Sequence, residues 1–523
     1  MEKLLRWLDR LGAIETENTF ARWLERVAFF FMILMFAAAP LSIAATQTAW
    51  LAGMFVWVIR LFVKPRPRLV RTPLDVALWA FFGWAIITSI FSYDSLTSFD
   101  KLRNVALFLI FYYVINVVRT SRAVVFLASV MIFSCMMTVA WTPIERIIGR
   151  GVEISGATAA SPLLKASFLN GDTLLKANGK KIKTPDDLVS EIEANETTRV
   201  FFYRPDFYFT LDVKRENLLG GATSLEKLGI AGWKRSRNWR SAGFYGHYTT
   251  FAEVLQLVAS LAFGLFIALS GKFLPQKNKD KEKNQPVPNN RRRLIMLAVC
   301  LAGMSLALLM TSTRASQLGF LVSAFAIVLT VGNRKMLLTL ALIVLPVALA
   351  GLFLLQQSRG VGFFDAEDDS TKWRQTVYRE GFDLWTDNPR HFFIGVGMDS
   401  IKKYAKQWRL FDDGKLPMGH FHSTPLQLLV EQGLPALLLW LWILWLYLRL
   451  LSRNLKNRLP DSEINWKTKG IVLGCFGGTI GFFTGGLVHY NLGDAEVAMV
   501  FFMLMGLSVS ICNSKFHAAR SIP

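Results

Sequence analysis

Long apolar runs constrain the fold of this chain more than any other feature of its sequence. A helix needs about 20 consecutive apolar residues to cross the hydrocarbon core of a bilayer. Runs of this length, or a few residues shorter, occur at 27–46, 49–63, 74–91, 104–118, 123–141, 248–270, 294–311, 316–331, 336–355, 433–451, 469–488 and 493–512. With about twelve such spans, the chain is predicted to be an all-α polytopic membrane protein whose two termini lie on one side of the membrane.

The basic residues indicate which side faces the cytoplasm. The chain has 59 Lys and Arg against 38 Asp and Glu, a net charge of +21. When successive loops are assigned alternately to the two sides, the cations collect on one face together with both termini. Short loops rich in Lys and Arg remain cytoplasmic, so the excess charge follows from topology and indicates no nucleic-acid partner. The Lys- and Asn-rich segment 271–293 is predicted to be a disordered loop on this face.

The opposite face receives two long segments, 142–247 and 356–432, where we expect the functional residues. The expected organisation is an N-terminal membrane bundle of about five spans over residues 1–141, followed by a small outer domain over 148–215. A C-terminal membrane bundle then covers 216–523, and it carries the outer loop 356–432.

The small outer domain has the sequence pattern of a short α+β fold. Asn178-Gly179 predicts a tight turn between two strands, and Thr184-Pro185 predicts the start of a helix. Closing strands are expected at 200–203 and 207–213. The stretch from Ser161 to Ile182 resembles the core of a PDZ domain, which implies docking of a periplasmic protein through an extended peptide. A purely structural insert is the alternative.

Two arginines stand at span boundaries on the outer face. Arg240 precedes the span at 248–270, and Arg314 lies in a short turn between two spans. An ionisable group at membrane depth is costly and therefore suggests a functional site. The alternative is that each side chain extends to the lipid headgroups, although the positive-inside rule disfavours a lone cation in an outer turn.

Two histidines, His420 and His422, end the second outer segment. Histidine can accept and donate protons near neutral pH, which makes this pair a candidate for acid–base chemistry, with a structural role as the alternative. No H-E-x-x-H motif is present, so we predict neither a metal ligand nor a cofactor. The four cysteines have no zinc-ligand spacing and are expected to be packing residues.

Several of these features together resemble the O-antigen ligase and O-antigen polymerase superfamily. The ligase signature has a His, then Asn, Ser or Gln, nine residues, Gly, two residues, and Gly, Thr or Tyr. His422, Ser423 and Gly433 match it, and Ala436 departs at the last place. Asn388-Pro389 followed by Gly395-Val396-Gly397 resembles the element upstream of this histidine.

The resemblance implies a GT-C-like helical bundle in the bacterial inner membrane. Its members transfer a glycan from an undecaprenyl pyrophosphate carrier to an acceptor on the periplasmic side. For a ligase, the acceptor is the lipid A core. An O-antigen or exopolysaccharide polymerase and a protein O-oligosaccharyltransferase are the alternatives. A lipid-linked glycan flippase fits less well, because it would place charged residues at the middle of the membrane.

The resemblance also implies roles for single residues. His422 would act as the general base or orient the acceptor hydroxyl, and Arg240 and Arg314 would bind the pyrophosphate, without a metal ion. Four further residues are expected to contact sugar or phosphate: Arg374, Tyr378, His420 and His247. The acidic residues at 365 and 367–369 are expected to form a solvated face.

Overall fold

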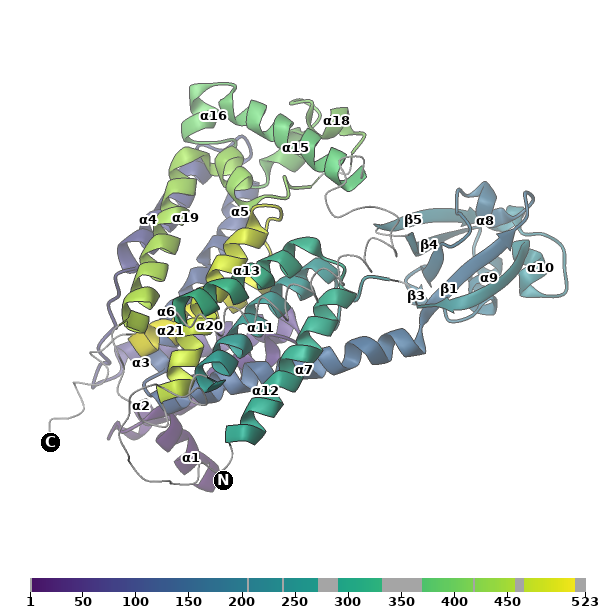
Figure 1. Ribbon diagram of the computed structural model, residues 1–523. Coiled ribbons are helices and arrows are strands. Elements are labelled where there is room, and N and C mark those ends of the chain that lie inside the picture. Colours follow the sequence, from purple (N-terminus) through teal and green to yellow (C-terminus); the bar gives the residue numbers. More distant parts are fainter. Residues whose placement is uncertain are drawn as a thin grey trace. The chain divides into compact units, whose positions relative to one another are not determined.

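The computed structural model describes residues 2–204, 207–237, 239–270, 290–331, 369–416, 419–456 and 465–512. The chain is mostly helical and divides into two compact units, whose elements are labelled in Figure 1. The first unit comprises Met1–Thr138 and Phe244–Pro523, and the second comprises Val139–Gly243. The boundary between them falls within helix α7 (Ser121–Ile148).

The first unit is a helical bundle. Its helices are α1 (Glu2–Gly12), α2 (Thr19–Ala38), α3 (Ile43–Phe62), α4 (Asp75–Ile90), α5 (Ser95–Val105), η1 (Ala106–Phe108), α6 (Leu109–Val117), α7, α11 (Tyr248–Ser270), α12 (Asn290–Met310), α13 (Arg314–Val331), α15 (Asp369–Thr386), α16 (Pro389–Phe393), α17 (Ser400–Tyr404), α18 (Leu410–Gly414), α19 (Thr424–Lys456), α20 (Asn465–Gly486) and α21 (Ala495–Cys512). In Figure 1, α15, α16 and α18 lie together at one end of the bundle, beyond α4 and α19.

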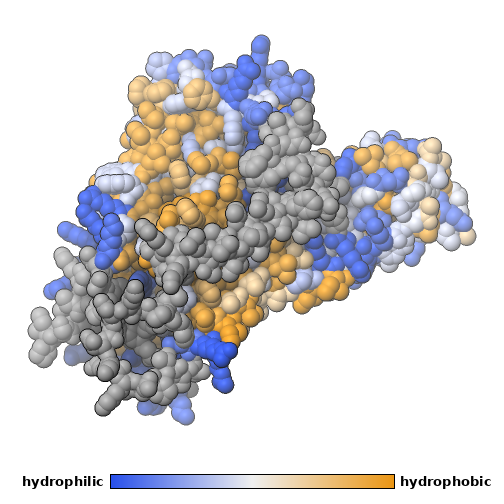
Figure 2. Space-filling model, viewed as in Figure 1, coloured by the Kyte–Doolittle hydropathy of each residue, from blue (hydrophilic) through white to orange (hydrophobic). Residues whose placement is uncertain are grey.

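Seven helices among the described residues are long and apolar enough to cross a membrane: α3, α7, α11, α12, α13, α19 and α21. Large apolar side chains on these helices lie exposed, such as Phe133 on α7 (74%) and Phe55 on α3 (67%). Figure 2 shows apolar side chains along the helices and polar ones at the α16 end. Lipid accommodates such a surface, whereas water does not. The chain is therefore a multi-pass membrane protein, and the total of twelve spans stays a prediction.

The helix boundaries correct several of the predicted spans. The apolar run 27–46 is not one helix, because α2 ends at Ala38 and a turn containing Pro40 separates it from α3. The run 104–118 is likewise divided between α5, η1 and α6. The span expected at 433–451 corresponds to the second part of a longer helix, α19, which begins at Thr424 and is kinked at Gly433. The run 336–355 and most of the loop 271–293 lie outside the described residues.

Helix α19 is kinked at the glycine of the ligase signature. Gly433 has φ 74° and ψ 178°, a conformation that is essentially restricted to glycine. Pro435 follows in the same helix and has no N–H to donate to the carbonyl of Glu431. The kink thus frees the carbonyls of Val430, Glu431 and Gln432 from regular helical hydrogen bonding.

Two distant segments provide donors for these freed carbonyls. The backbone N–H groups of Val396 and Gly397 donate to the carbonyls of residues 430 and 431, at 2.9 and 2.8 Å. The indole of Trp84, on α4, donates to the carbonyl of residue 432 at 2.8 Å. The Gly-x-Gly element and the signature glycine therefore form one structure, which fixes the first part of α19, residues 424–432, at the end of the bundle where α16 lies.

Close glycine contacts join α20 to α11 and α13. A Cβ added at Gly264 of α11 would lie 2.3 Å from the backbone nitrogen of Gly474, and one added at Gly319 of α13 would lie 2.8 Å from the carbonyl of Gly481. Small residues allow such close approach between helices in a membrane. The buried Gln256 side chain donates to Ser323 at 3.1 Å and so also links α11 with α13. These three helices form a tightly packed group.

A buried ion cluster holds the N-terminal helices together. The carboxylate of Glu25 contacts the guanidinium groups of Arg60 and Arg119, each at 2.8 Å, and accepts a hydrogen bond from Thr16. The side chains of Glu25 and Arg60 are only 6% and 4% exposed. Breaking such a pair leaves a buried charge without its counter-charge.

The substitution Glu25→Ala is expected to lower the free energy of unfolding by about 3–5 kcal/mol, because Arg60 then stays buried without a carboxylate. Glu2→Ala removes the exposed Glu2–Arg6 pair and is expected to change it by less than about 1 kcal/mol. Thermal unfolding of the two purified variants in detergent checks this difference. Equal losses in both variants would contradict it.

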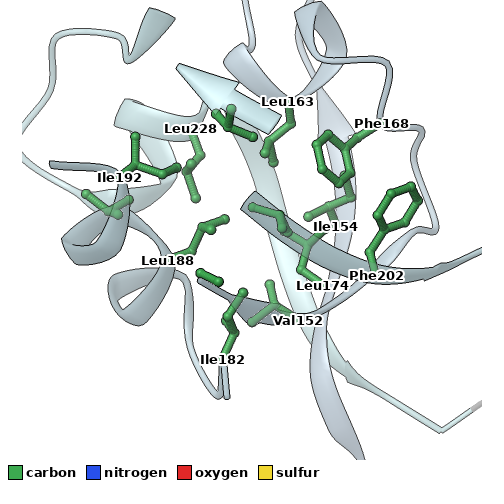
Figure 3. Close-up of a cluster of buried hydrophobic side chains, with 14 of the residues drawn as sticks. Val152, Ile154, Leu163, Phe168, Leu174, Ile182, Leu188, Ile192, Phe202 and Leu228 are labelled. Carbon is green, nitrogen blue, oxygen red and sulfur yellow. The ribbon is translucent and has the colours of Figure 1, made fainter. Parts of the chain in front are cut away.

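The second unit is an α+β domain built on one antiparallel sheet. Its elements are β1 (Arg150–Ala157), α8 (Pro162–Lys165), β2 (Thr173–Ala177), β3 (Lys180–Lys181), α9 (Pro185–Ala194), β4 (Thr197–Arg204), β5 (Phe207–Lys214), η2 (Arg215–Asn217), α10 (Ser224–Leu228) and β6 (Ile230–Ser236). The sheet order is β5-β4-β2-β1-β6, and β3 pairs with β2. Figure 3 shows its core, in which Leu188 and Ile192 of α9 lie with Val152 and Ile154 of β1.

The predicted elements of this domain are present, and one additional strand follows them. The turn at Asn178-Gly179 joins β2 and β3, and α9 begins after Thr184. Strand β6 lies beyond the expected boundary at 215 and pairs along β1, from Ala157 opposite Ile230 to Arg150 opposite Ser236. Since β1 is paired on both sides, strand addition by a foreign peptide is left to the sheet edges, β5 and β6. The PDZ resemblance stays a prediction.

Candidate functional site

Three histidines meet at the end of the first unit where α15 packs on α19. His420 and His422 precede α19, and His489 lies in the turn between α20 and α21. The ring centroids of His420 and His422 are 4.0 Å apart, and each lies 5.6 Å from that of His489. Nitrogen atoms of the three rings lie within 4.8 Å of one another. The structure thus brings the predicted histidine pair together with a third one.

Hydrogen bonds hold the backbone around His422 in an uncommon conformation. His422 has φ 49°, in the left-handed region, and its carbonyl accepts a hydrogen bond from the hydroxyl of Tyr378 at 2.9 Å. The N–H of Phe421 donates to Gln427 at 2.8 Å, and that of His422 donates to Nδ1 of His420 at 3.1 Å. The ring of Trp373 packs edge-on against His422, with centroids 4.5 Å apart. Tyr378 and Trp373 belong to α15, so this helix positions His422.

His489 pairs with a carboxylate from a different helix. Nδ1 of His489 lies 2.8 Å from Oε1 of Glu253, which projects from the first turns of α11. The Glu253 side chain is 5% exposed and that of His489 is 15% exposed. The carbonyl of His489 accepts from both the N–H and the hydroxyl of Thr424, each at 3.2 Å. The turn is therefore bound directly to the start of α19.

The surroundings give the three histidines different pKa values. Burial, and then the adjacent ring of His420, lowers the pKa of His422 to about 2. Burial, and then His489, lowers the pKa of His420 to about 3. Burial also acts to lower the pKa of His489, but the carboxylates of Glu253 and Asp494 outweigh it and raise that pKa. Of the three, His489 holds a proton most readily.

Three imidazoles are also the kind of donor set that a transition metal takes. However, Nδ1 of His420 already accepts a hydrogen bond from a backbone N–H, so a neutral His420 carries its proton on Nε2. Neither nitrogen of that ring then offers a free lone pair. The arrangement does not present three free nitrogens, and the absence of a metal ligand stays a prediction.

Arginines lie near the histidine cluster. Arg374, on α15, is half-buried, and its charge is close enough to lower the pKa of His422. Its Nε is buried and has no hydrogen-bond partner among the described residues. Arg314 is the first residue of α13 rather than part of a turn, and the carbonyl of the next residue, Ala315, lies at the end of α20 near Gly485. Both arginines therefore belong to the same end of the bundle as the histidines.

The remaining predicted residues divide between the two units. His247 is exposed just before α11, and its charge acts on both His420 and His422. Arg240 belongs to the second unit, where it follows the buried Trp239. The site of the first unit is therefore described without Arg240.

A pocket adjoins the histidine cluster at His420. Its wall is apolar along α4, α19 and α21 and polar near His420 and Tyr490. Lys101 and Lys402 line it, and both contact the carboxylate of Asp399, at 3.1 and 2.9 Å. Gln432 also lines it, and its buried Oε1 has no hydrogen-bond partner among the described residues. Such an oxygen can accept a hydrogen bond from a bound hydroxyl.

Sequence reasoning did not single out Glu253, His489 or Gln432. Glu253 carried a usable signal, because a carboxylate within an apolar run suggests function. His489 also carried a signal, since it stands in a turn predicted to lie on the same face of the membrane as His422. Gln432 carried no such sequence signal, because only the kink of α19 distinguishes it from other polar residues of that helix.

Comparison with known proteins assigns part of this unit. Residues 299–441 match the model of the O-antigen ligase family. The matched range includes Arg314, Arg374, His420 and His422. No curated protein sequence matches the chain. Residues 299–441 of this multi-pass membrane protein are therefore similar to the O-antigen ligase family.

Proposed function

We propose that the protein transfers a glycan from undecaprenyl pyrophosphate to an acceptor hydroxyl at the periplasmic face of the bacterial inner membrane, with the lipid A core as the acceptor. One observation carries the proposal: within the family match, α15 holds His422 and also carries Arg374, whose buried Nε has no hydrogen-bond partner among the described residues. A neutral imidazole beside an available guanidinium suits an attack by a hydroxyl on a phosphate-linked sugar.

Each group has a distinct task in this reaction. The acceptor hydroxyl loses its proton toward His422 as its oxygen bonds to the anomeric carbon. The bond from that carbon to the pyrophosphate breaks, and negative charge gathers on the leaving group. Arg374 and Arg314 stabilise this charge, since guanidinium groups match phosphate oxygens and stay protonated. Fixed arginines make the transfer independent of metal ions. Attack opposite the leaving group inverts the anomeric configuration.

A deletion strain complemented with His422→Ala tests the proposal. The variant is expected to insert and accumulate normally but to transfer no glycan, so bare acceptor and carrier-bound polymer remain. Glycolipid gels and membrane immunoblots measure the two outcomes. Normal transfer by the variant would refute the role of His422. Accumulation of acceptor carrying single repeats would instead identify a polymerase.

A further inference from the structure

A buried acid–histidine pair stands next to the proposed site and has no part in the mechanism above. Glu253 contributes a carboxylate from α11, and His489 contributes a ring from the turn before α21. Both side chains are largely buried, and the Nδ1–Oε1 distance is 2.8 Å. Among the described residues, neither oxygen of Glu253 nor Nδ1 of His489 has a hydrogen-bond partner, so the close approach of the two side chains is an ion-pair contact.

This contact fixes the tautomer of His489. A carboxylate oxygen this close repels a lone pair and attracts a proton, so Nδ1 of the neutral ring carries the proton and Nε2 carries the lone pair. A ring nitrogen of His422 lies within 4.8 Å of one on His489. One bridging water, or a small rotation of either ring, spans that separation.

We propose that Glu253 and His489 form the pair that receives and holds the proton released in the transfer, with His422 passing it on. This inference rests on the proposed function. The proton leaves the acceptor oxygen for His422 and moves on to Nε2 of His489, which becomes an imidazolium beside the Glu253 carboxylate. The electron pair of the anomeric C–O bond leaves with the pyrophosphate. The imidazolium then releases its proton to water, which restores the pair.

The charges around the three rings support this direction of transfer. His489 faces the carboxylates of Glu253 on α11 and Asp494 before α21, and these outweigh the cation of Arg374 on α15 and raise its pKa. The other two rings, His420 and His422, have strongly lowered pKa values. A proton taken up by His422 is therefore held more strongly by His489.

Packing holds Glu253 in place. Gln256, one turn later on α11, is fixed between Ser260 and Ser323, and Gly264 brings α11 into backbone contact with α20. Since α20 leads directly into the turn of His489, the same interface sets the distance between the carboxylate and the ring. The packing of α11 on α20 thus holds the Glu253–His489 pair inside the bundle.

The test is the pH–rate profile of the full-length protein in detergent, with undecaprenyl pyrophosphate-linked glycan as donor and O-antigen-free lipopolysaccharide as acceptor. The base must be unprotonated, so the wild-type rate rises with pH through the pKa of His489. Glu253→Gln is expected to lower kcat about 100-fold, with little change in KM, and to move this rise to lower pH. Glu253→Asp keeps the charge and is expected to leave the rise in place at an intermediate rate.

A control variant separates the possible outcomes. Asp383→Asn removes an exposed carboxylate of α15 that pairs only weakly with Arg379, and it is expected to change the rate less than about twofold. An unchanged profile in Glu253→Gln would overturn the inference, and so would a slower rate whose pH dependence stays in place. Absence of transfer by the wild-type protein would instead refute the proposed function itself.

Discussion

Alanine at position 433 is expected to prevent the protein from accumulating in a folded form. Any other residue that adopted the backbone conformation of Gly433 would be strained by about 1–3 kcal/mol. In addition, a Cβ there would lie 2.2 Å from the carbonyl oxygen of Phe393. The backbone of that segment would have to move, which would break the hydrogen bonds to the freed carbonyls of α19. A total loss of more than about 3 kcal/mol is therefore expected.

The matched control for this substitution is Gly83→Ala. Gly83 lies in helix α4, and a Cβ added there would meet nothing within 4 Å. Alanine also favours a helix more than glycine does. Membrane immunoblots and thermal unfolding in detergent compare the two variants. If Gly433→Ala were as stable as Gly83→Ala, the kink would not be the element that fixes the start of α19.

Replacement of Arg374 by alanine is expected to reduce glycan transfer at least about 100-fold while the protein accumulates normally. The reason is electrostatic: Arg374 places a cation near His422, its buried Nε has no hydrogen-bond partner among the described residues, and the proposed mechanism develops negative charge there. Lysine at this position keeps the charge but not the forked donors, so partial activity is expected. Transfer assays in membranes of the complemented deletion strain measure both variants.

Arg379 provides the control on the same helix. Its side chain is 85% exposed and pairs only weakly with Asp383, at 3.9 Å. Arg379→Ala is expected to change transfer by less than about twofold. Comparable losses in the two variants would mean that the net charge of α15, rather than the placement of Arg374, supports the activity.

The sequence predicted most of the local structure, because apolar runs and turn residues act over short distances. Helices α7, α11 and α12 follow from their apolar runs, and α9 follows from Thr184-Pro185. The division of 27–46 was missed because Ala, Pro and Leu continue the apolar character through the turn at Pro40. The early start of α19 was missed because residues 424–432 include polar side chains that face the protein interior.

The site was predictable only in part. His420 and His422 share a motif, so their proximity is local. The pairing of Glu253 with His489 joins positions 236 residues apart, and only the glycine packing of α11 on α20 brings them together. The hydrogen bond from the indole of Trp84 to the carbonyl of residue 432 also joins distant parts of the sequence. The functional roles assigned to His422, Arg314 and Arg240 stay predictions for the experiments above.

The contact between the kink and the Gly-x-Gly element has an evolutionary consequence. Gly395 approaches the peptide between residues 431 and 432, just as Gly433 approaches Phe393, so each glycine fills the space that the other segment leaves. Neither glycine can be replaced by a larger residue unless the other segment changes as well. Among descendants of one ancestral gene, the two glycines should be retained or lost as a linked pair, and insertions should accumulate outside the two segments.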